Sequence, residues 1–376
     1  MLHYIGNYAK SRFNAPYPRN IWELKAYRGR LYLGCGNSSN EQPSPNAGPV
    51  DIVCYDPASQ DFVVEASQIP EEQIERFVIL DDRLLLPGHD PTRNDNLRIY
   101  LREADGSWTF IPCGEGQRQY HLYDLTPYQG WLYLAKGINF LQSDAAARIR
   151  LSDFWAEQYR FTELPVPSRS RLCTMCRPAW RLYHFFEVGG QLYAIGELSN
   201  LNTYSGAGPG GAYVYSPWSN AWNQLDNLFF LGVNPKLATI RFSANLNDRL
   251  VYIVSKKHND HHHWPQQMAW TDGQSVTPIP CPEGCEAGFL PWDVTVVDGA
   301  AYGLFSKPIG DQFEVQVRTS RDLTNWAVTF TTQLPSFARA FAYLDGDWYL
   351  GLGCEWIDGQ WYGNPDAAGM IYRWSV

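Results

Sequence analysis

Three arginines, three carboxylates and one histidine occupy equivalent positions in successive segments of this sequence. Each lies eight to ten residues before the centre of a strand pattern that recurs along the chain, and aromatic residues stand beside several of them. Arginine binds carboxylate or sulfate groups through paired hydrogen bonds, two carboxylates can act as general acid and base, and aromatic faces suit sugar rings. The candidate catalytic residues are Glu23, Asp124, His184 and Asp293, and the candidate ligand-binding residues are Trp22, Arg76, Tyr123, Tyr183, Arg241, Trp292 and Arg339.

The same residues also admit a purely structural interpretation. If each arginine pairs with a neighbouring carboxylate, the ring of charges is satisfied by itself and only holds the elements together. A shift of one residue in the alignment of a strand would also turn a side chain to the opposite face. Both interpretations stay open at the level of the sequence.

Cysteines and histidines provide a second group of candidates. Two close cysteine pairs have spacings that suit zinc, which is the one cofactor that the sequence suggests, although no cofactor is required. Free buried thiols and disulfides are the alternatives, and Cys35 and Cys354 are the pair best placed for a disulfide. The histidine-rich stretch HNDHHHW offers metal ligands or only a solvated loop. The candidate metal ligands are Cys173, Cys176, Cys281, Cys285, His258, His261 and His263.

The element that must position these residues is a repeated hairpin. A short apolar strand, a tight polar turn and a strand of the type apolar-Tyr-apolar recur seven times, as in YRGRLYLG at 27–34 and VGGQLYAIG at 188–196. A third and a fourth strand follow each hairpin. Four antiparallel strands repeated seven times predict an all-β, seven-bladed β-propeller, whose ring the N-terminal strand closes. The centres of the seven repeats are Leu31, Leu84, Leu132, Leu192, Val251, Ala301 and Trp348.

The whole chain, 1–376, is then one domain. The loops that follow each second and each fourth strand lie on one face of a propeller, around the mouth of its central channel, where ligands bind. The predicted blades are 20–66, 75–112, 120–164, 181–225, 237–279, 289–331 and 337–376, the last completed by an N-terminal strand at 2–9.

Two stretches resemble known propeller families. LYLGCG and DIVCYDPASQDF in the first repeat, with QLYAIGE and AYVYSPWSNAW in the fourth, resemble the strands of kelch-type propellers, although the glycine doublet of that family is broken here. SRDLTNW at 320–326 is similar to the Asp-box of sialidase-like propellers, with Thr324 in place of its glycine. The second resemblance implies a structural hairpin turn and no catalytic role.

Composition narrows the classes of function. The chain has 30 Lys and Arg against 39 Asp and Glu, for a net charge of −9. This balance disfavours partners with a negatively charged surface, such as nucleic acid or an anionic membrane. The start of the sequence has no secretion signal pattern, which favours the cytoplasm, with release by lysis or non-classical export left open. No phosphate-binding glycine motif is present, and no Ser-His-Asp triad can be assembled from spacing alone.

Three functions remain. The first is a binding propeller whose mouth recognises an anionic or sugar-like ligand or a segment of a partner protein. The second is a glycosidase or lyase that acts on an acidic saccharide, with Glu23, Asp124 or Asp293 as acid and base and the three arginines holding the acid. The third is a structural or interaction module, such as a component of a phage or of a secreted complex.

Overall fold

The computed structural model describes residues 1–39, 43–92, 97–113, 121–137, 145–164, 179–198, 210–225, 228–234, 238–258, 262–279 and 288–375. Within these residues the chain is almost entirely β-sheet. The exceptions are two one-turn helices and a 3-10 turn, α1 (Tyr8–Arg12), α2 (Leu151–Trp155) and η1 (Tyr17–Arg19). Among the described helices, none has the length and apolar character that crossing a membrane requires.

Five sheets contain four antiparallel strands each. The first is β2 (Glu23–Tyr27), β3 (Arg30–Gly34), β4 (Val50–Asp56) and β5 (Asp61–Ile69); the second is β6 (Val78–Leu80), β7 (Arg83–Pro87), β8 (Arg98–Arg102) and β9 (Trp108–Pro112); the third is β18 (Ala238–Leu246), β19 (Arg249–His258), β20 (His262–Thr271) and β21 (Val276–Pro278); the fourth is β22 (Leu290–Val297), β23 (Ala300–Ile309), β24 (Gln312–Ser320) and β25 (Ala327–Leu334); the fifth is β26 (Ala338–Leu344), β27 (Asp347–Leu352), β30 (Ile371–Ser375) and β1 (Leu2–Gly6).

An eight-stranded sheet holds two further series of four strands. The pairing of Gly137 with Arg181 joins the two series into one sheet. The series are β10 (His121–Tyr128), β11 (Trp131–Gly137), β12 (Ala146–Arg150) and β13 (Thr162–Leu164), then β14 (Ala179–Val188), β15 (Gln191–Leu198), β16 (Gly210–Ser216) and β17 (Ala221–Leu225), and a small hairpin, β28 (Glu355–Ile357) and β29 (Gln360–Tyr362), stands apart from them.

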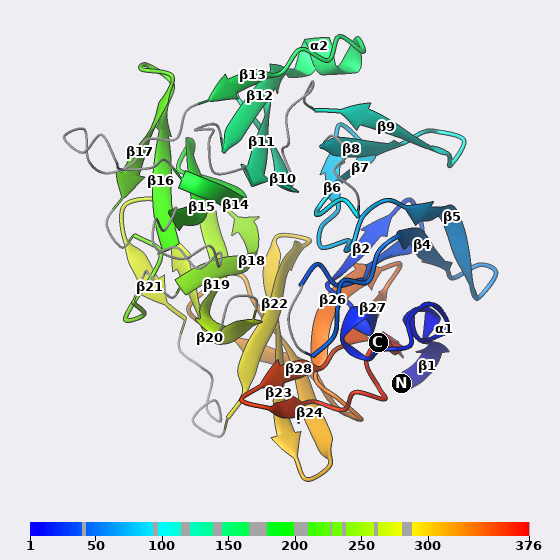
Figure 1. Ribbon diagram of the computed structural model, residues 1–376. Coiled ribbons are helices and arrows are strands. Elements are labelled where there is room, and N and C mark those ends of the chain that lie inside the picture. The colour runs from blue at the N-terminus through cyan, green and yellow to red at the C-terminus, as the bar shows by residue number, and fades with distance from the viewer. Residues whose placement is uncertain are drawn as a thin grey trace.

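The sheets surround a common centre (Figure 1). The first strands of neighbouring sheets contact one another in the order β6, β10, β14, β18, β22, β26 and β2. The predicted propeller fold with four-stranded antiparallel blades is therefore confirmed. Five blades stand as separate sheets, instead of the predicted seven, because β11 and β14 hydrogen-bond across the gap between the series 121–164 and 179–225. The kelch-type resemblance stays a prediction.

A two-residue turn joins the first strand to the second in every one of these seven series. Both turn residues have positive φ, the conformation of a type I′ turn, whose twist matches that of antiparallel strands. Glycine, asparagine and aspartate tolerate this conformation best, and they supply most of the positions. The turns are Arg28–Gly29, Asp81–Asp82, Gln129–Gly130, Gly189–Gly190, Asn247–Asp248, Asp298–Gly299 and Asp345–Gly346.

The core lies between neighbouring sheets. The seven residues at the centres of the sequence repeats are at most 2% exposed. One cluster, for example, packs Tyr32 of the first sheet against Phe77 and Leu84 of the second. Burial of these apolar side chains is the main force that holds one sheet against the next.

The SRDLTNW stretch forms the turn between β24 and β25. The Asp322 carboxylate accepts the backbone N–H groups of Thr324 and Asn325 at 2.9 and 2.8 Å, and these hydrogen bonds hold its pKa well below the usual range. The hydroxyl of Ser320 donates to the same carboxylate at 3.0 Å. An exposed carboxylate that organises backbone donors in this way stabilises a hairpin turn.

Candidate functional site

The first strands of five series carry a β-bulge close to where each begins. A bulge inserts one extra residue, so that two successive side chains no longer alternate regularly across the strand. The register shifts lie between Leu122 and Asp124, Leu182 and His184, Ile240 and Ser243, Pro291 and Asp293, and Ala338 and Ala340. Most of the candidate residues lie at these bulges, which decide whether each of them faces a cavity or a neighbouring sheet.

Two of the candidate catalytic carboxylates are buried links between sheets. Asp124 accepts the backbone N–H of Leu125 at 2.9 Å and, across the gap, that of Phe185 at 2.9 Å. Asp293 repeats this pattern with Val294 at 2.7 Å and Phe341 at 3.1 Å. Burial raises the pKa of both carboxyl groups. Each carboxylate therefore joins its own first strand to the interior of the next first strand.

The third candidate carboxylate makes the same link from the first sheet. Glu23 accepts the backbone N–H of Phe77, just before β6, and its other oxygen lies 3.5 Å from the ammonium group of Lys25. Burial raises the pKa of Glu23 as well. We call Glu23, Asp124 and Asp293 the latch carboxylates, because each joins one first strand to the next.

The three candidate arginines have different surroundings. Arg76 pairs with the latch carboxylate Asp124 at 3.2 Å and contacts His184 Nδ1 at 2.8 Å. Arg339 is 2% exposed and pairs with the buried Glu355. Only Arg241 among them lines the cavity described next.

The aromatic candidates Trp22 and Trp292 also have different surroundings. The Arg339 guanidinium lies over the Trp22 ring, 4.0 Å from its centre, and 5.8 Å from the centre of Trp292. Trp292 stacks on Phe337, with 4.0 Å between ring centres, and is buried. Trp22 belongs to the cavity lining, and Trp292 packs in the core between two sheets.

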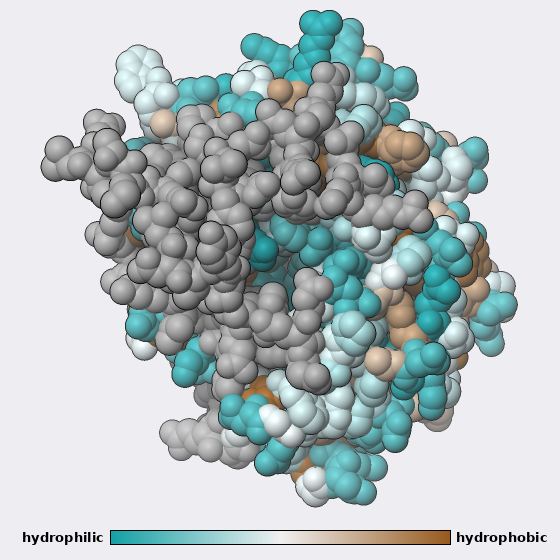
Figure 2. Space-filling model, viewed as in Figure 1, coloured by the Kyte–Doolittle hydropathy of each residue, from teal (hydrophilic) through white to brown (hydrophobic). Residues whose placement is uncertain are grey.

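A cavity of about 290 Å³, here called the mouth cavity, opens among the first strands. Figure 2 shows that this face of the molecule is hollowed near its centre, with hydrophilic residues in the hollow. Segments far apart in the sequence meet there, as expected where loops converge on a propeller mouth. The lining is Tyr17, Trp22, Asn37, Ser38, Ser39, Asn46, Glu72, Gln73, Glu75, His89, Asp90, His121, Tyr123, Arg181, Tyr183, His184, Thr239, Ile240 and Arg241.

The polar side chains of the mouth cavity form two layers. His121, Arg181, Tyr183 and Arg241 are half-buried, so they face the open space, whereas Tyr123 behind them is 6% exposed. Tyr123 stacks on His121, with ring centres 5.2 Å apart, and contacts Tyr183 at 4.9 Å. The half-buried layer therefore unites an imidazole, a phenol and two guanidinium groups around one space.

Imidazole protonation is set by burial and by neighbouring charges. His89 and His184 are buried, and burial lowers the pKa of each, well below its ordinary value for His184, where the Arg76 charge adds to the effect. Both imidazoles are therefore mainly neutral at neutral pH. His121 has Nδ1 at 3.3 Å from Asp90 and Nε2 at 3.5 Å from the Arg181 guanidinium.

Arg241 is held on two sides. Its guanidinium pairs with Glu75 and lies over the Trp22 ring, 4.5 Å from the ring centre. Its Nε–H is buried and has no hydrogen-bond partner among the residues that the structure describes. An unpaired buried donor of this kind is costly.

A second cavity, of about 560 Å³, lies along the central channel. Glu75, His184 and Arg241 line both cavities, so the two spaces are neighbours. Glu23, Arg76 and Asp293 line only the channel cavity. The bulges thus divide the candidate ring between the mouth and the channel.

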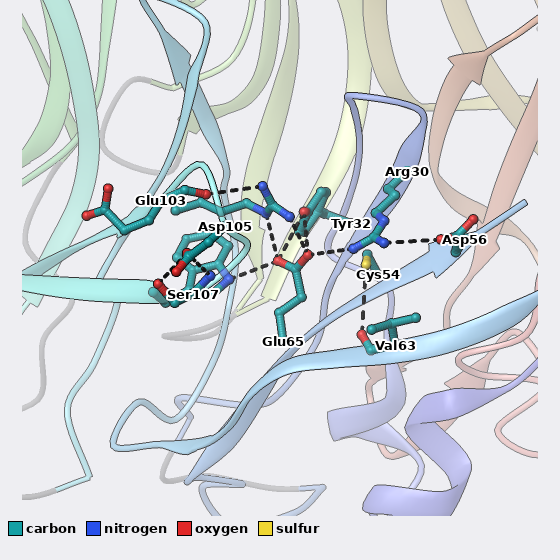
Figure 3. A network of polar contacts seen from close by, with 11 residues as sticks. Arg30, Tyr32, Cys54, Asp56, Val63, Glu65, Glu103, Asp105 and Ser107 are labelled. Atoms are coloured by element: carbon teal, nitrogen blue, oxygen red, sulfur yellow. Dashed lines mark hydrogen bonds and ion pairs between the residues drawn. The ribbon is translucent and has the colours of Figure 1, made fainter. Parts of the chain in front are cut away.

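A third cavity, of about 430 Å³, surrounds the Glu65 carboxylate between the first two sheets. Glu65 accepts hydrogen bonds from Arg102 at 2.7 and 2.9 Å, from Arg30 at 2.9 Å, from the Tyr32 hydroxyl and from Trp108 Nε1 at 3.0 Å (Figure 3). We call this group the Glu65 cluster. Burial opposes ionisation, but the hydrogen bonds from Arg102 and Trp108 prevail and lower the pKa of Glu65.

Several residues of the mouth cavity were missed at the sequence level. His121 and Arg181 each stand two positions before a candidate tyrosine, in the stretches HLY and RLY, and a signal based on that shared spacing could have found them. His89 lies in the GHD stretch after β7, and Glu75 lies directly before Arg76. Isolated polar residues in connecting segments give no periodic signal.

The candidate metal ligands are mostly beyond what the structure describes. Cys173, Cys176, Cys281, Cys285 and His261 lie outside the described residues, and only the backbone of His258 and His263 is described, in β19 and β20. Within the described ranges, no group of histidine, cysteine and carboxylate side chains is arranged to hold a metal ion.

The cysteines of the described segments are free. Cys35 and Cys354, the pair best placed under the disulfide alternative, are not bonded, and these two thiols, with Cys54 and Cys113, are buried. Burial raises the pKa of Cys35 to about 12 and that of Cys54 to about 11, so both stay protonated and unreactive at neutral pH. They pack as small apolar side chains.

Comparison with known proteins completes the description of the site. No protein-family model matches the chain, and no curated protein matches it. Among solved structures, the chain is similar to a PL25 ulvan lyase, a polysaccharide lyase, in a free form and in a form bound to -[GlcA(1-4)Rha3S]-. The TM-scores are 0.54 and 0.53 at 11% identity, over 98% of this chain and 94% of the lyase.

A second similar structure is an ancestral GH74 enzyme. Its TM-score is 0.51 at 9% identity, and the match covers 95% of this chain and 48% of that enzyme. Likeness at such low identity shows the fold alone, because one propeller architecture serves many unrelated functions. By fold, the chain resembles β-propellers that include enzymes active on polysaccharides.

Proposed function

We propose that this protein is a lyase that cleaves an acidic polysaccharide by β-elimination in the mouth cavity. The observation that carries the proposal is the space that Arg241, His121, Arg181 and Tyr183 line together in the mouth cavity. β-Elimination at a uronic acid needs a cation on the carboxylate, a base for the neighbouring carbon-bound proton and an acid for the leaving oxygen.

The two arginines act on the uronate group. Arg241 is oriented by Glu75 and Trp22, so its guanidinium is held in place before a ligand arrives. A carboxylate bound in the mouth cavity pairs with the guanidinium groups of Arg241 and Arg181, which both line it. Neutralising the carboxylate acidifies the adjacent C–H bond, because the negative charge that develops on the acid group is stabilised.

The imidazole of His121 and the phenol of Tyr183 supply the proton transfers. His121 Nε2 takes the proton from the carbon next to the carboxylate, and the C–H electrons form a carbon–carbon double bond. The glycosidic C–O bond on the next carbon breaks, and the Tyr183 hydroxyl gives its proton to the departing oxygen. Arg241 and Arg181 provide the positive charge for this reaction, so the proposal includes no cofactor.

A second candidate function is hydrolysis of the glycosidic bond. The latch carboxylates are engaged with backbone N–H groups, but Glu72 lines the mouth cavity and has a pKa raised to about 8 by burial and by Asp90. A carboxyl group that stays protonated at neutral pH suits a general acid. Hydrolysis would leave no double bond in the product, so the product distinguishes the two reactions.

Elimination is tested by the near-ultraviolet absorbance of the unsaturated product on incubation with uronate-containing polysaccharides. The expected result is a rising absorbance that Arg241→Ala or His121→Ala abolishes and that Arg28→Ala retains, since Arg28 is exposed and pairs with Asp82 away from the cavity. Binding of the polymer without any unsaturated product would overturn the lyase and leave a binding propeller. New reducing ends without absorbance would instead support hydrolysis.

We also propose that the architecture has seven blades, with the eight-stranded sheet counted as two. The order of contacts among the first strands and the pairing of β1 with β30 support this number, because β1 then completes the last blade and closes the ring. Deleting residues 1–6 should lower the melting temperature cooperatively for the whole chain. Unchanged melting would contradict closure by this strand.

A further inference from the structure

A serine, a histidine and a carboxylate lie in line on one wall of the mouth cavity. The hydroxyl oxygen of Ser38 is 3.2 Å from Nε2 of His89, and Nδ1 of the same ring is 3.1 Å from the Glu75 carboxylate. All three side chains line the cavity. They come from three separate segments, after β3, before β6 and after β7, so the fold and not the local sequence brings them together.

His89 is the most deeply buried of the three side chains, and Glu75 beyond it is half-buried. Ser38 is half-buried, and His89 behind it is 7% exposed. Because Glu75 accepts the proton on Nδ1, the other nitrogen of His89 presents a lone pair to the serine. This is the order in which a nucleophile, a general base and an orienting carboxylate act in acyl transfer.

We propose that Ser38, His89 and Glu75 form a nucleophilic triad that hydrolyses carboxylic esters in the mouth cavity. The inference goes beyond the elimination reaction and does not depend on it, since its reacting groups are different. The substrate class is an acyl ester of an alcohol or sugar hydroxyl that enters the same cavity.

The reaction balances without a co-reactant other than water. Ser38 Oγ attacks the ester carbonyl carbon while its proton moves to His89 Nε2. The ester C–O bond breaks, and the alcohol leaves with that proton. Water then attacks the acyl-serine, again through His89, and releases the carboxylic acid and free Ser38. Glu75 is a positioning residue, which fixes the tautomer of His89 and stabilises the imidazolium.

Two neighbours bear on the efficiency of this triad. The Ser38 hydroxyl also donates to Oε1 of Gln73 at 3.3 Å, an oxygen that accepts the backbone N–H of Ser38 as well, so Gln73 competes with His89 for the hydroxyl proton. Arg241 is ion-paired with the same Glu75 and lines the same cavity, so its positive charge lies close to the orienting carboxylate. Burial lowers the pKa of His89, so the ring is available as a base at neutral pH.

The test uses the full chain and p-nitrophenyl acetate, an ester without a uronate group, so a failure of the elimination proposal does not affect the result. Hydrolysis above the buffer rate should fall by at least about a hundredfold in Ser38→Ala and in His89→Ala. Ser44→Ala, in the same connection but outside the cavity lining, should keep the rate. Unchanged hydrolysis in Ser38→Ala would overturn the triad.

A labelling experiment guards against variants that fail to fold. The unmodified protein is treated with a fluorophosphonate, which reacts with activated serines, and the adduct is located by mass spectrometry. Modification at Ser38 that Glu75→Gln slows, without loss of the melting transition, is the expected result. Modification at other serines, or no modification, would overturn the proposal.

Discussion

The mouth cavity and the Glu65 cluster are both rich in arginine, yet they differ in how their hydrogen bonds are satisfied. In the Glu65 cluster, Arg30 and Arg102 donate to one carboxylate whose oxygens accept from five donor atoms on four side chains. In the mouth cavity, the Nε–H of Arg241 has no partner among the described residues. The number of arginines therefore does not distinguish a ligand site from a structural clamp, whereas the convergence of their donors on one protein carboxylate marks the clamp.

The largest expected effect is on the rate of elimination, which should depend on the arginine of the mouth cavity and not on the arginine of the Glu65 cluster. Arg241→Lys keeps the charge but removes the planar fork, so elimination should fall by about a hundredfold while stability changes little. The matched variant Arg102→Lys should leave elimination intact and lower the midpoint of urea unfolding. Initial rates and unfolding curves on the same preparations provide the measurement. Equal loss of elimination activity in both variants would contradict the functional difference between the mouth cavity and the Glu65 cluster.

A smaller effect is expected on stability alone. Glu65→Ala leaves the guanidinium groups of Arg30 and Arg102 without their shared carboxylate, which should lower the free energy of unfolding by about 2 kcal/mol. Elimination per folded molecule should not change, because the cluster does not line the mouth cavity. Urea unfolding at neutral pH measures the first quantity. A loss below about 0.5 kcal/mol would show that the cluster is not a clamp.

The smallest expected effect is a contrast in pH dependence. The pKa of Glu65 is lowered, so its stabilisation is complete above its unfolded value of about 4.3 and is lost as the pH falls through the folded value. Glu71, next to the mouth cavity residue Glu72, has a pKa raised by burial to about 7. The folded chain therefore holds an extra proton between about pH 4.3 and 7, and stability falls as the pH rises across that window.

Two variants measure this contrast. Glu71→Gln keeps an acceptor for the Tyr100 hydroxyl, so relative to the unmodified protein it should gain about 1 kcal/mol or more between pH 5 and 8. Glu65→Gln should converge on the unmodified protein only below about pH 4. Urea unfolding across this pH range gives both curves. Parallel curves for the two variants would contradict the assigned burial effects.

The architecture could be predicted from the sequence because its signals are local and repeated. Apolar-Tyr-apolar strands after two-residue turns predict the four-stranded units, and residues such as Leu31 and Leu192 are buried as their period requires. The number of separate sheets could not be predicted, since the pairing of Gly137 with Arg181 depends on how two units approach in space.

The candidate site was harder to predict. Asp124 and Tyr123 are adjacent in sequence, and nothing in the residue types announces the bulge that gives one to a neighbouring sheet and the other to the mouth cavity. The lining of the cavity also includes Ser38, Glu75 and His89, which lie in connecting segments. The positions of these segments depend on tertiary contacts. Sequence periodicity locates strands, but it does not locate polar residues between them.

The repeated bulge has a consequence for how this molecule can change. Asp124 is hydrogen-bonded to the next first strand, and Tyr123 just before it lines the mouth cavity. Asp293 makes the same link, but Trp292 just before it packs in the core. When several strands each contribute such a residue to the cavity, its ligand selectivity can change through substitutions in one strand at a time. Substitutions at the half-buried Tyr183 would then change selectivity and leave the hydrogen bonds that join the first strands in place.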